Sequence, residues 1–199
     1  STPPLALSCS EKSITISQSF FVASVGGVRK LEIELGESAM VMGQGLLGIF
    51  ATQFLRLSGA NPVIAVDLNP QRRELALKLG ADYALDPTEA DFVKTVKSIT
   101  GGGVNTVIEV TGLGIGMDQS LDCMARFGRI ALLGCTRSSK FEIDYYGKVH
   151  GRGISLIGAH TMMRPKVESS AGLWTTEDDL NTVLNLVKGG RLNFKDMIC

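Results

Sequence analysis

The stretch Val41-Met42-Gly43-Gln44-Gly45-Leu46-Leu47-Gly48 decides the fold of this chain of 199 residues. It joins a short apolar run, 38–42, to a segment with helical periodicity, 46–57, through glycines in the pattern G-x-G-x-x-G. Gly43 permits a tight turn at the end of a strand, Gly45 lets a bulky group approach its backbone, and Gly48 allows the helix to pack close to the sheet. The stretch therefore predicts a strand, a tight turn and a helix.

The next apolar run gives this turn a binding role. Residues 63–66 predict a second buried strand, and Asp67 follows it, 19 residues after Gly48. Strand, glycine turn, helix, strand and acid in this order form the fingerprint of a dinucleotide-binding unit, in which the amides and dipole of the helix N-terminus hold the diphosphate. A glycine turn without a ligand is the alternative interpretation.

The acid at the end of the second strand indicates which dinucleotide is bound. Asp67 can accept hydrogen bonds from both hydroxyls of the adenosine ribose and would repel a 2′-phosphate, so we expect NAD rather than NADP. Arg72 and Arg73 argue the other way, because an arginine near that corner can pair with a phosphate. The alternative is that both arginines belong to a solvated helix face.

The composition is that of a folded globular protein and excludes several classes of function. Hydrophobic residues make up 44% of the chain and charged residues 20%. Basic and acidic side chains are equal in number, 20 of each, with no basic stripe for nucleic acid and no block of charge for a membrane surface. No apolar run approaches the roughly 18 residues of a transmembrane helix, and the N-terminal residues lack the pattern of a signal peptide. We expect a cytoplasmic protein without nucleic-acid or membrane partners.

Cysteines and histidines do not predict a metal site in this chain. The cysteines are Cys9, Cys123, Cys135 and Cys199. They are scattered, form no C-x-x-C pair, and fit free thiols better than a disulfide framework. The two histidines, His150 and His160, flank the last expected strand, and we interpret them as surface or interface residues. Cys135 could be a nucleophile, but no histidine lies predictably beside it.

The rest of the chain alternates between strand and helix patterns. We expect strands at residues 38–42, 63–67, 83–86, 104–110, 129–133 and 154–157, and helices at 14–28, 46–58, 70–80, 88–99, 118–127 and 176–188. The second glycine run, 112–116, is interpreted as a turn. The pattern predicts an α/β fold, a doubly wound six-stranded parallel sheet of the Rossmann type. We expect residues 36–199 to form a dinucleotide-binding domain, and residues 1–35 to be a remnant of, or link to, a missing catalytic domain.

Several motifs together resemble a known family. They are Gly36-Glu37-Ser38, the glycine pattern, Asp67, Leu79-Gly80-Ala81-Asp82, Ile108-Glu109-Val110-Thr111-Gly112 and Gly128-Arg129-Ile130-Ala131-Leu132-Leu133-Gly134. In this order they resemble the cofactor-binding domain of zinc-type medium-chain alcohol and polyol dehydrogenases, over residues 18–199. The resemblance implies an NAD-dependent oxidoreductase in which this domain holds the cofactor and the missing domain polarises the oxygen of an alcohol or polyol.

The resemblance also assigns roles to residues at the ends of the expected strands. It places Asp67 and Arg72 at the adenosine ribose, Gly45 and Leu47 at the diphosphate, and a further group near the nicotinamide: Leu133, Cys135, Ser155 and Ile157. The complete predicted cofactor site consists of Gly43, Gln44, Gly45, Leu46, Leu47, Gly48, Asp67, Leu68, Arg72, Val110, Thr111, Gly112, Leu133, Gly134, Cys135, Ser155 and Ile157. No catalytic residue is predicted. The strand at 154–157 would pair across the two-fold axis of a homodimer.

The resemblance places the zinc and the proton relay in the missing catalytic domain, to which the family chain returns near Cys199. Many zinc-dependent relatives carry a Cys or Glu ligand roughly 25 residues before the first glycine. That position holds Gln18 here, followed by Ser19, and neither is a good zinc ligand. We therefore expect the isolated chain to bind NAD without turning over alcohols. Two alternatives stay open: a zinc-free quinone or enoyl reductase, normally NADPH-dependent, and a non-catalytic dinucleotide sensor.

Overall fold

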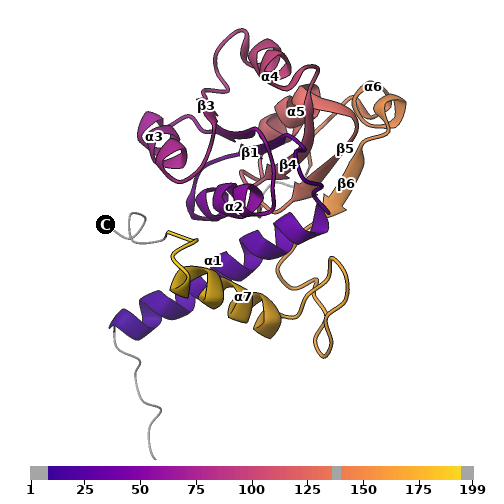
Figure 1. The fold of residues 1–199 in the computed structure, drawn as a ribbon. Coiled ribbons are helices and arrows are strands. Elements are labelled where there is room, and N and C mark those ends of the chain that lie inside the picture. The colour runs from indigo at the N-terminus through magenta and orange to yellow at the C-terminus, as the bar shows by residue number, and fades with distance from the viewer. Residues whose placement is uncertain (1–8, 136–139, 194–199) are drawn as a thin grey trace, which may run out of the picture.

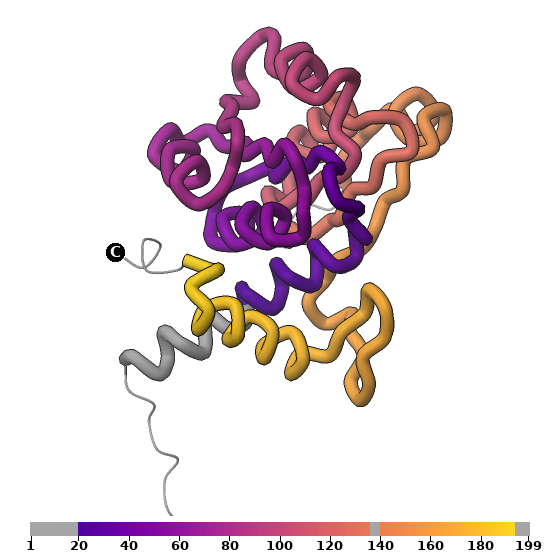
Figure 2. Tube along the Cα trace, in the orientation of Figure 1, coloured from indigo at the N-terminus to yellow at the C-terminus, as the bar shows by residue number. Residues whose placement is uncertain are grey.

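A computed structural model of the chain describes the backbone of residues 9–135 and 140–193 and the side chains of residues 20–135 and 140–193. Cys199 and the side chains of Cys9, Gln18 and Ser19 lie outside this description. The described chain forms one α/β unit in which a central sheet is covered on both faces, with α7 packed outside α1 (Figures 1 and 2).

The sheet has six strands in the order β3-β2-β1-β4-β5-β6, and all neighbouring strands are parallel. The strands are β1 Ala39–Met42, β2 Val63–Val66, β3 Tyr83–Leu85, β4 Val104–Glu109, β5 Met124–Leu132 and β6 Ser155–Gly158. The chain builds outward from β1 to β3 and then returns to the other side of β1. This is the predicted doubly wound sheet, and its order reverses between β1 and β4.

The helices are α1 Cys9–Lys30, α2 Leu46–Leu57, α3 Pro70–Lys78, α4 Phe92–Thr100, α5 Gly114–Cys123, α6 Tyr145–Lys148 and α7 Thr176–Lys188, with a short 3-10 helix, η1, at His150–Arg152. Asn69 caps α3, because its side chain accepts the backbone N–H groups of Gln71 and Arg72.

Alternation along the strands divides the core into two layers. In β1, Ala39 and Val41 face α1 and α2, whereas Met40 and Met42 face α4 and α5. The first layer includes buried side chains of α1, such as Val25. The described side chains of α1 therefore contribute to the core of the sheet. The domain boundary expected at residue 36 stays a prediction.

Several predicted element boundaries were wrong. The helix expected at 14–28 is α1, which begins at Cys9 and ends at Lys30. The helix expected at 118–127 is α5, which begins at Gly114, so the run 112–116 is part turn and part helix. Residues 124–128 belong to β5, where an irregularity shifts the register against β4. The helix expected from residue 88 begins at Phe92. Helix α6 and η1 were not predicted, because four and three residues carry too little periodicity to detect.

Candidate functional site

Two adjoining hollows lie at the carboxyl ends of the central strands. The larger has a volume of about 610 Å³ and is lined by the ends of β1 and β2, residues 87–89, Thr111 and the start of α5. The smaller, of about 340 Å³, lies against Phe20, Gly45 and Leu47. Both are lined by Gly43, Asp67, Arg72 and Thr111. Together they cross the reversal in strand order, where ligands bind in open sheets of this kind.

The glycine turn has the geometry that each glycine was predicted to provide. Gly43 has a φ of +98°, which favours glycine, and its N–H continues the sheet by donating to Val66 O at 2.7 Å. A Cβ on Gly48 would lie 1.9 Å from the carbonyl oxygen of Gly43, so only glycine allows α2 to start so close to the turn. Apart from its immediate neighbours in the chain, no described residue has an atom within 4 Å of the place a Cβ on Gly45 would take.

Asp67 connects the end of β2 to this turn. Its carboxylate accepts the backbone N–H of Gln44 at 2.7 Å and that of Asn69 at 2.8 Å. The side chain of Gln44 points inward and is buried, where it donates to Val41 O and accepts from Thr52. Gln44 therefore faces Asp67 with its backbone only, and its side chain is part of the core.

The two arginines near Asp67 have different environments. Arg73 Nη1 donates to the carbonyl oxygens of Asp67 and Leu68 and pairs with Asp86 at 2.9 Å, so it braces the turns after β2 and β3. The side chain of Arg72 is 54% exposed, and its Nη1 lies 3.7 Å from the carboxylate of Asp67. Arg72, and not Arg73, is therefore in a position to contact a ligand in the two hollows, which together we call the cleft.

The turn after β4 is held by a buried carboxylate that the sequence prediction did not include. Glu109 accepts the N–H groups of Thr111, at 2.8 Å, and Gly112, at 3.1 Å, together with the hydroxyl of Thr111. A Cβ on Gly134 would lie 2.4 Å from the nitrogen of Gly112, so the turn after β5 packs directly against it. The expected group Val110, Thr111, Gly112 and Gly134 is therefore brought together beside Gly43.

The remaining predicted residues are more widely spread. Leu133 is buried against α1, and Cys135 is exposed just beyond the end of β5. Ser155 pairs with Arg129, whereas Gly158 pairs with Leu132 at the carboxyl edge. The structure therefore places Ser155 at the opposite end of β6 from the cleft, and Ile157 packs against the core.

The wall of the larger hollow contains residues that the sequence prediction missed. They are Met42, Val66, Pro87, Thr88, Glu89, Leu113, Ile115, Gly116 and Gln119. The only available signal was the second glycine run, which follows a strand and precedes a helix as a binding turn would. Because this run was interpreted as a plain turn, Leu113 and Ile115 were not included in the predicted cofactor site.

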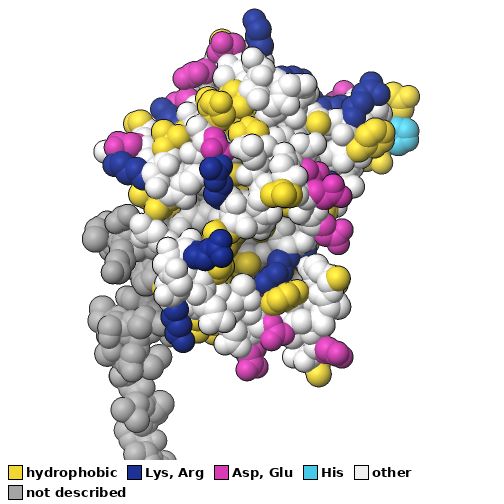
Figure 3. All heavy atoms as spheres, viewed as in Figure 1, with side chains coloured by type: hydrophobic (Ala, Val, Ile, Leu, Met, Phe, Trp, Pro, Cys, Tyr) yellow, Lys and Arg dark blue, Asp and Glu magenta, His cyan; other side chains and the backbone are white. Residues whose placement is uncertain are grey.

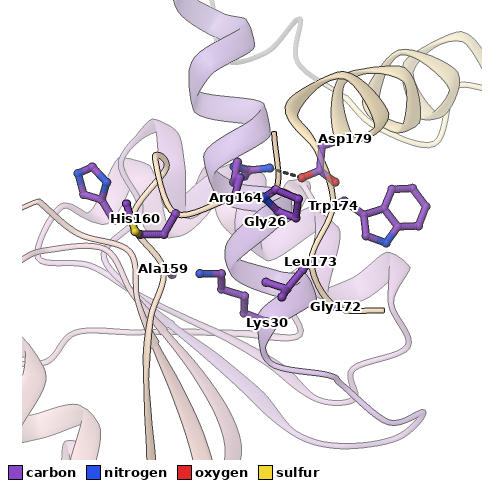
Figure 4. Close-up of a pocket in the computed structure, with 11 residues that line it drawn as sticks. Gly26, Lys30, Ala159, His160, Arg164, Gly172, Leu173, Trp174 and Asp179 are labelled. Atoms are coloured by element: carbon purple, nitrogen blue, oxygen red, sulfur yellow. Dashed lines mark hydrogen bonds and ion pairs between the residues drawn. The ribbon is translucent and has the colours of Figure 1, made fainter. Parts of the chain in front are cut away.

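A separate small pocket lies between α1, the segment 159–174 and α7 (Figure 4). Asp179 is fully buried there, accepts from Arg29 Nε at 2.7 Å and pairs with Arg164, while Arg29 also lies over the ring of Trp174 at 3.6 Å. The cavity measures about 10 Å³, room for about one water molecule. We interpret these ion pairs as structural contacts that hold α1 and α7 together.

The described residues do not provide the donor set of a zinc site. No three His, Cys, Asp or Glu side chains among them converge as metal ligands would. Burial raises the pKa of the Cys123 thiol to about 12, and the nearby carboxylate of Asp122 adds to the shift, so its thiolate is disfavoured.

Two further features are the distribution of charge on the surface and the apolar character of the helices. On the face shown in Figure 3, basic and acidic side chains of the described residues are interspersed. Among the described helices, none combines the length and apolar character of a membrane-spanning segment.

Comparison with known proteins identifies a family. The sequence pattern of the zinc-binding dehydrogenases matches residues 47–175. L-threonine 3-dehydrogenase of Pyrococcus horikoshii is 34% identical over 164 residues, which cover 82% of this chain and 43% of that protein.

Solved structures have the same fold. An alcohol dehydrogenase zinc-binding domain protein from Burkholderia ambifaria matches with a TM-score of 0.77 and 28% identity, over 89% of this chain and 45% of its own. A chain from Sinorhizobium meliloti 1021, described as a zinc-binding dehydrogenase bound to NADP, matches with a TM-score of 0.73 and 25% identity, over 89% and 49%.

The chain belongs to the zinc-binding dehydrogenase family. The resemblance predicted from the glycine turn, Asp67 and the later motifs is thereby confirmed. The chain spans about half the length of the relatives it matches, or slightly less.

Proposed function

We propose that this chain binds a nicotinamide dinucleotide, with NAD preferred, and presents it for oxidation of an alcohol or polyol in a larger protein. The observation that carries the proposal is the bond between the Asp67 carboxylate and the N–H of Gln44. It fixes an acidic acceptor for ribose hydroxyls directly beside the turn that would hold the diphosphate.

The start of α2 supports a diphosphate at this place. No described side chain caps α2, and its first turn contains no acidic residue, whereas Asn69 and Thr175 cap α3 and α7. The first amides of α2 are therefore available to an anion, and the helix dipole favours negative charge there. The open space above Gly45 would admit the phosphates.

NADP is the second candidate, and Arg72 favours it. Its guanidinium, 3.7 Å from Asp67, could pair with a 2′-phosphate and offset the repulsion by the carboxylate. The S. meliloti structure also contains NADP. We place NAD first because Asp67 lies in the cleft and its side chain is only 9% exposed, which strengthens its effect on a nearby phosphate.

The reaction itself would need groups outside the described residues. Dehydrogenation of an alcohol requires a group that polarises the oxygen and a path for the proton, and we propose that both, with any zinc, belong to a separate catalytic domain. The role of this chain would be to hold and orient the cofactor.

Titration calorimetry of the 199-residue chain with NADH and NADPH tests the proposal. We expect both to bind, NADH more tightly, and no oxidation of alcohols in the presence of zinc. Absence of binding by both would overturn the cofactor proposal, and equal affinities would show that Arg72 cancels the effect of Asp67. Alcohol oxidation by this chain would disprove the assignment of chemistry to another domain.

A further inference from the structure

One polar side chain in the larger hollow has a fixed orientation and an unused acceptor. Gln119 lies in α5, is half-buried and lines the hollow together with Leu68 and Ile115. Its Nε2 donates to the carbonyl oxygen of Pro87 at 2.9 Å. Because a carbonyl oxygen only accepts, the amide must turn its NH₂ group toward Pro87 and its oxygen, Oε1, away from it.

The amide oxygen remains accessible. Among the described residues, the one buried side-chain N or O atom without a hydrogen-bond partner is Ser120 Oγ, so Gln119 Oε1 is not a buried orphan. The hydrogen bonds of the described residues give this oxygen no donor, and Gln119 lines the hollow. An acceptor of known orientation is therefore available to a ligand.

The carbonyl that orients Gln119 belongs to a turn that several side-chain contacts hold in place. Asp86 accepts the N–H of Thr88 at 2.9 Å and its hydroxyl at 2.6 Å, and pairs with Arg73. Arg73 in turn donates to Asp67 O and Leu68 O. These contacts hold the amide of Gln119 in place relative to Asp67. Asp67 is the residue proposed to bind the ribose.

The surroundings of Gln119 fit a flat aromatic base. Leu68, Leu113 and Ile115 are 65%, 57% and 69% exposed and line the same hollow, so they offer apolar surface against which a ring could pack. A base packed on these side chains would still need partners for the polar groups on its edge.

We infer that Gln119 recognises the adenine of the dinucleotide, with Oε1 accepting a hydrogen bond from the exocyclic 6-amino group. The inference rests on the proposed dinucleotide site and adds the selection of its base. Glutamine amides pair with the adenine 6-amino group in other recognition contexts for the same reason of donor and acceptor matching. In hypoxanthine an oxygen replaces this amino group, so two acceptors would face each other and the hydrogen bond would be lost.

Binding of NADH and of reduced nicotinamide hypoxanthine dinucleotide to the full chain, measured by calorimetry, tests the inference. We expect the unmodified chain to bind NADH about five- to tenfold more tightly, the effect of about one hydrogen bond. In Gln119→Leu and Gln119→Met the ratio should fall close to one. Gln71→Leu, an exposed glutamine on α3, is the matched control and should keep the full ratio.

The ratio separates base recognition from a merely structural role. If Gln119 only latched α5 to Pro87, its replacement would weaken both dinucleotides equally and leave the ratio unchanged, which would overturn the inference. A ratio near one in the unmodified chain would overturn it as well, even if a variant fails to fold, while leaving the proposed function intact. If neither dinucleotide binds, the proposed function fails and the inference with it.

Discussion

The carboxylate of Asp67 accepts a hydrogen bond from the backbone N–H of Gln44, with 2.7 Å between the oxygen and the nitrogen. This bond joins the end of β2 to the glycine turn after β1, the two parts of the sequence fingerprint. The carboxylate that would bind the ribose therefore also holds the turn that would bind the diphosphate. Both contacts depend on the parallel pairing of β1 with β2.

Substitution of Asp67 by Ser or Gly should narrow the preference for NADH over NADPH. NADH should bind about tenfold more weakly, because the variant loses the ribose acceptor and a support of the turn. NADPH should lose less or gain, because repulsion of its 2′-phosphate disappears while Arg72 stays. Calorimetric titration measures both, with Asp91→Ser, an exposed carboxylate outside the hollows, as control. An unchanged ratio in the Asp67 variants would disprove this role.

Gly48→Ala should destabilise the fold, whereas Gly45→Ala should leave its stability nearly unchanged. A methyl group at Gly48 would meet the carbonyl oxygen of Gly43 at 1.9 Å, and we expect a loss of about 1–3 kcal/mol in the free energy of unfolding. At Gly45, where φ is −69° and the space is open, stability should be nearly unchanged. Urea unfolding measures the difference.

Binding should be reduced in both glycine variants. In Gly45→Ala the methyl group would occupy the space proposed for the diphosphate, so a stable protein should bind NADH poorly. Full NADH affinity in a stable Gly45→Ala variant would place the diphosphate elsewhere.

The thiols should differ strongly in reactivity. Cys135 is exposed, whereas Cys123 is buried with a pKa raised to about 12 by loss of hydration, so at pH 8 only about one Cys123 in ten thousand would be a thiolate. Alkylation followed by peptide mass spectrometry should modify Cys135 rapidly and leave Cys123 intact in the folded protein. NADH should slow the reaction of Cys135 if that residue borders the cofactor. Rapid modification of Cys123 would contradict its burial, and lack of protection would remove Cys135 from the predicted site.

Dimer formation through β6 remains a prediction. The reason for it is that β6 lies at an edge of the described sheet. In the described sheet β6 has β5 on one side only, and Leu156 is 40% exposed. Pairing of two β6 strands across a two-fold axis would satisfy the backbone groups of that edge. We expect light scattering to show a dimer at tens of micromolar and Leu156→Asp to give monomers. Leu57→Asp, at a similarly exposed leucine on α2, is the control and should remain dimeric. A monomer for the unmodified chain would contradict the prediction.

The local pattern of the chain was enough to predict most of the architecture. Short apolar runs bounded by glycine, proline or aspartate located all six strands, and alternation with helices implied that they are parallel. The positions of Gly43, Gly48 and Asp67 followed from spacing, because these residues act through the backbone or at the end of a strand. Boundaries failed where helix and strand patterns overlap, as between Gly114 and Gly128.

The sequence by itself therefore determined the class of fold, the glycine turn and the acid at the end of the second strand, since these depend on neighbours in the chain. Only the tertiary structure decided which of two adjacent arginines braces the sheet and which faces the cleft, because that depends on Asp86 in another element. The same holds for the buried support of Glu109 and for Gln119, whose amide is oriented by Pro87, 32 residues away. Contacts of this kind arise when distant segments pack together, and no local periodicity records them.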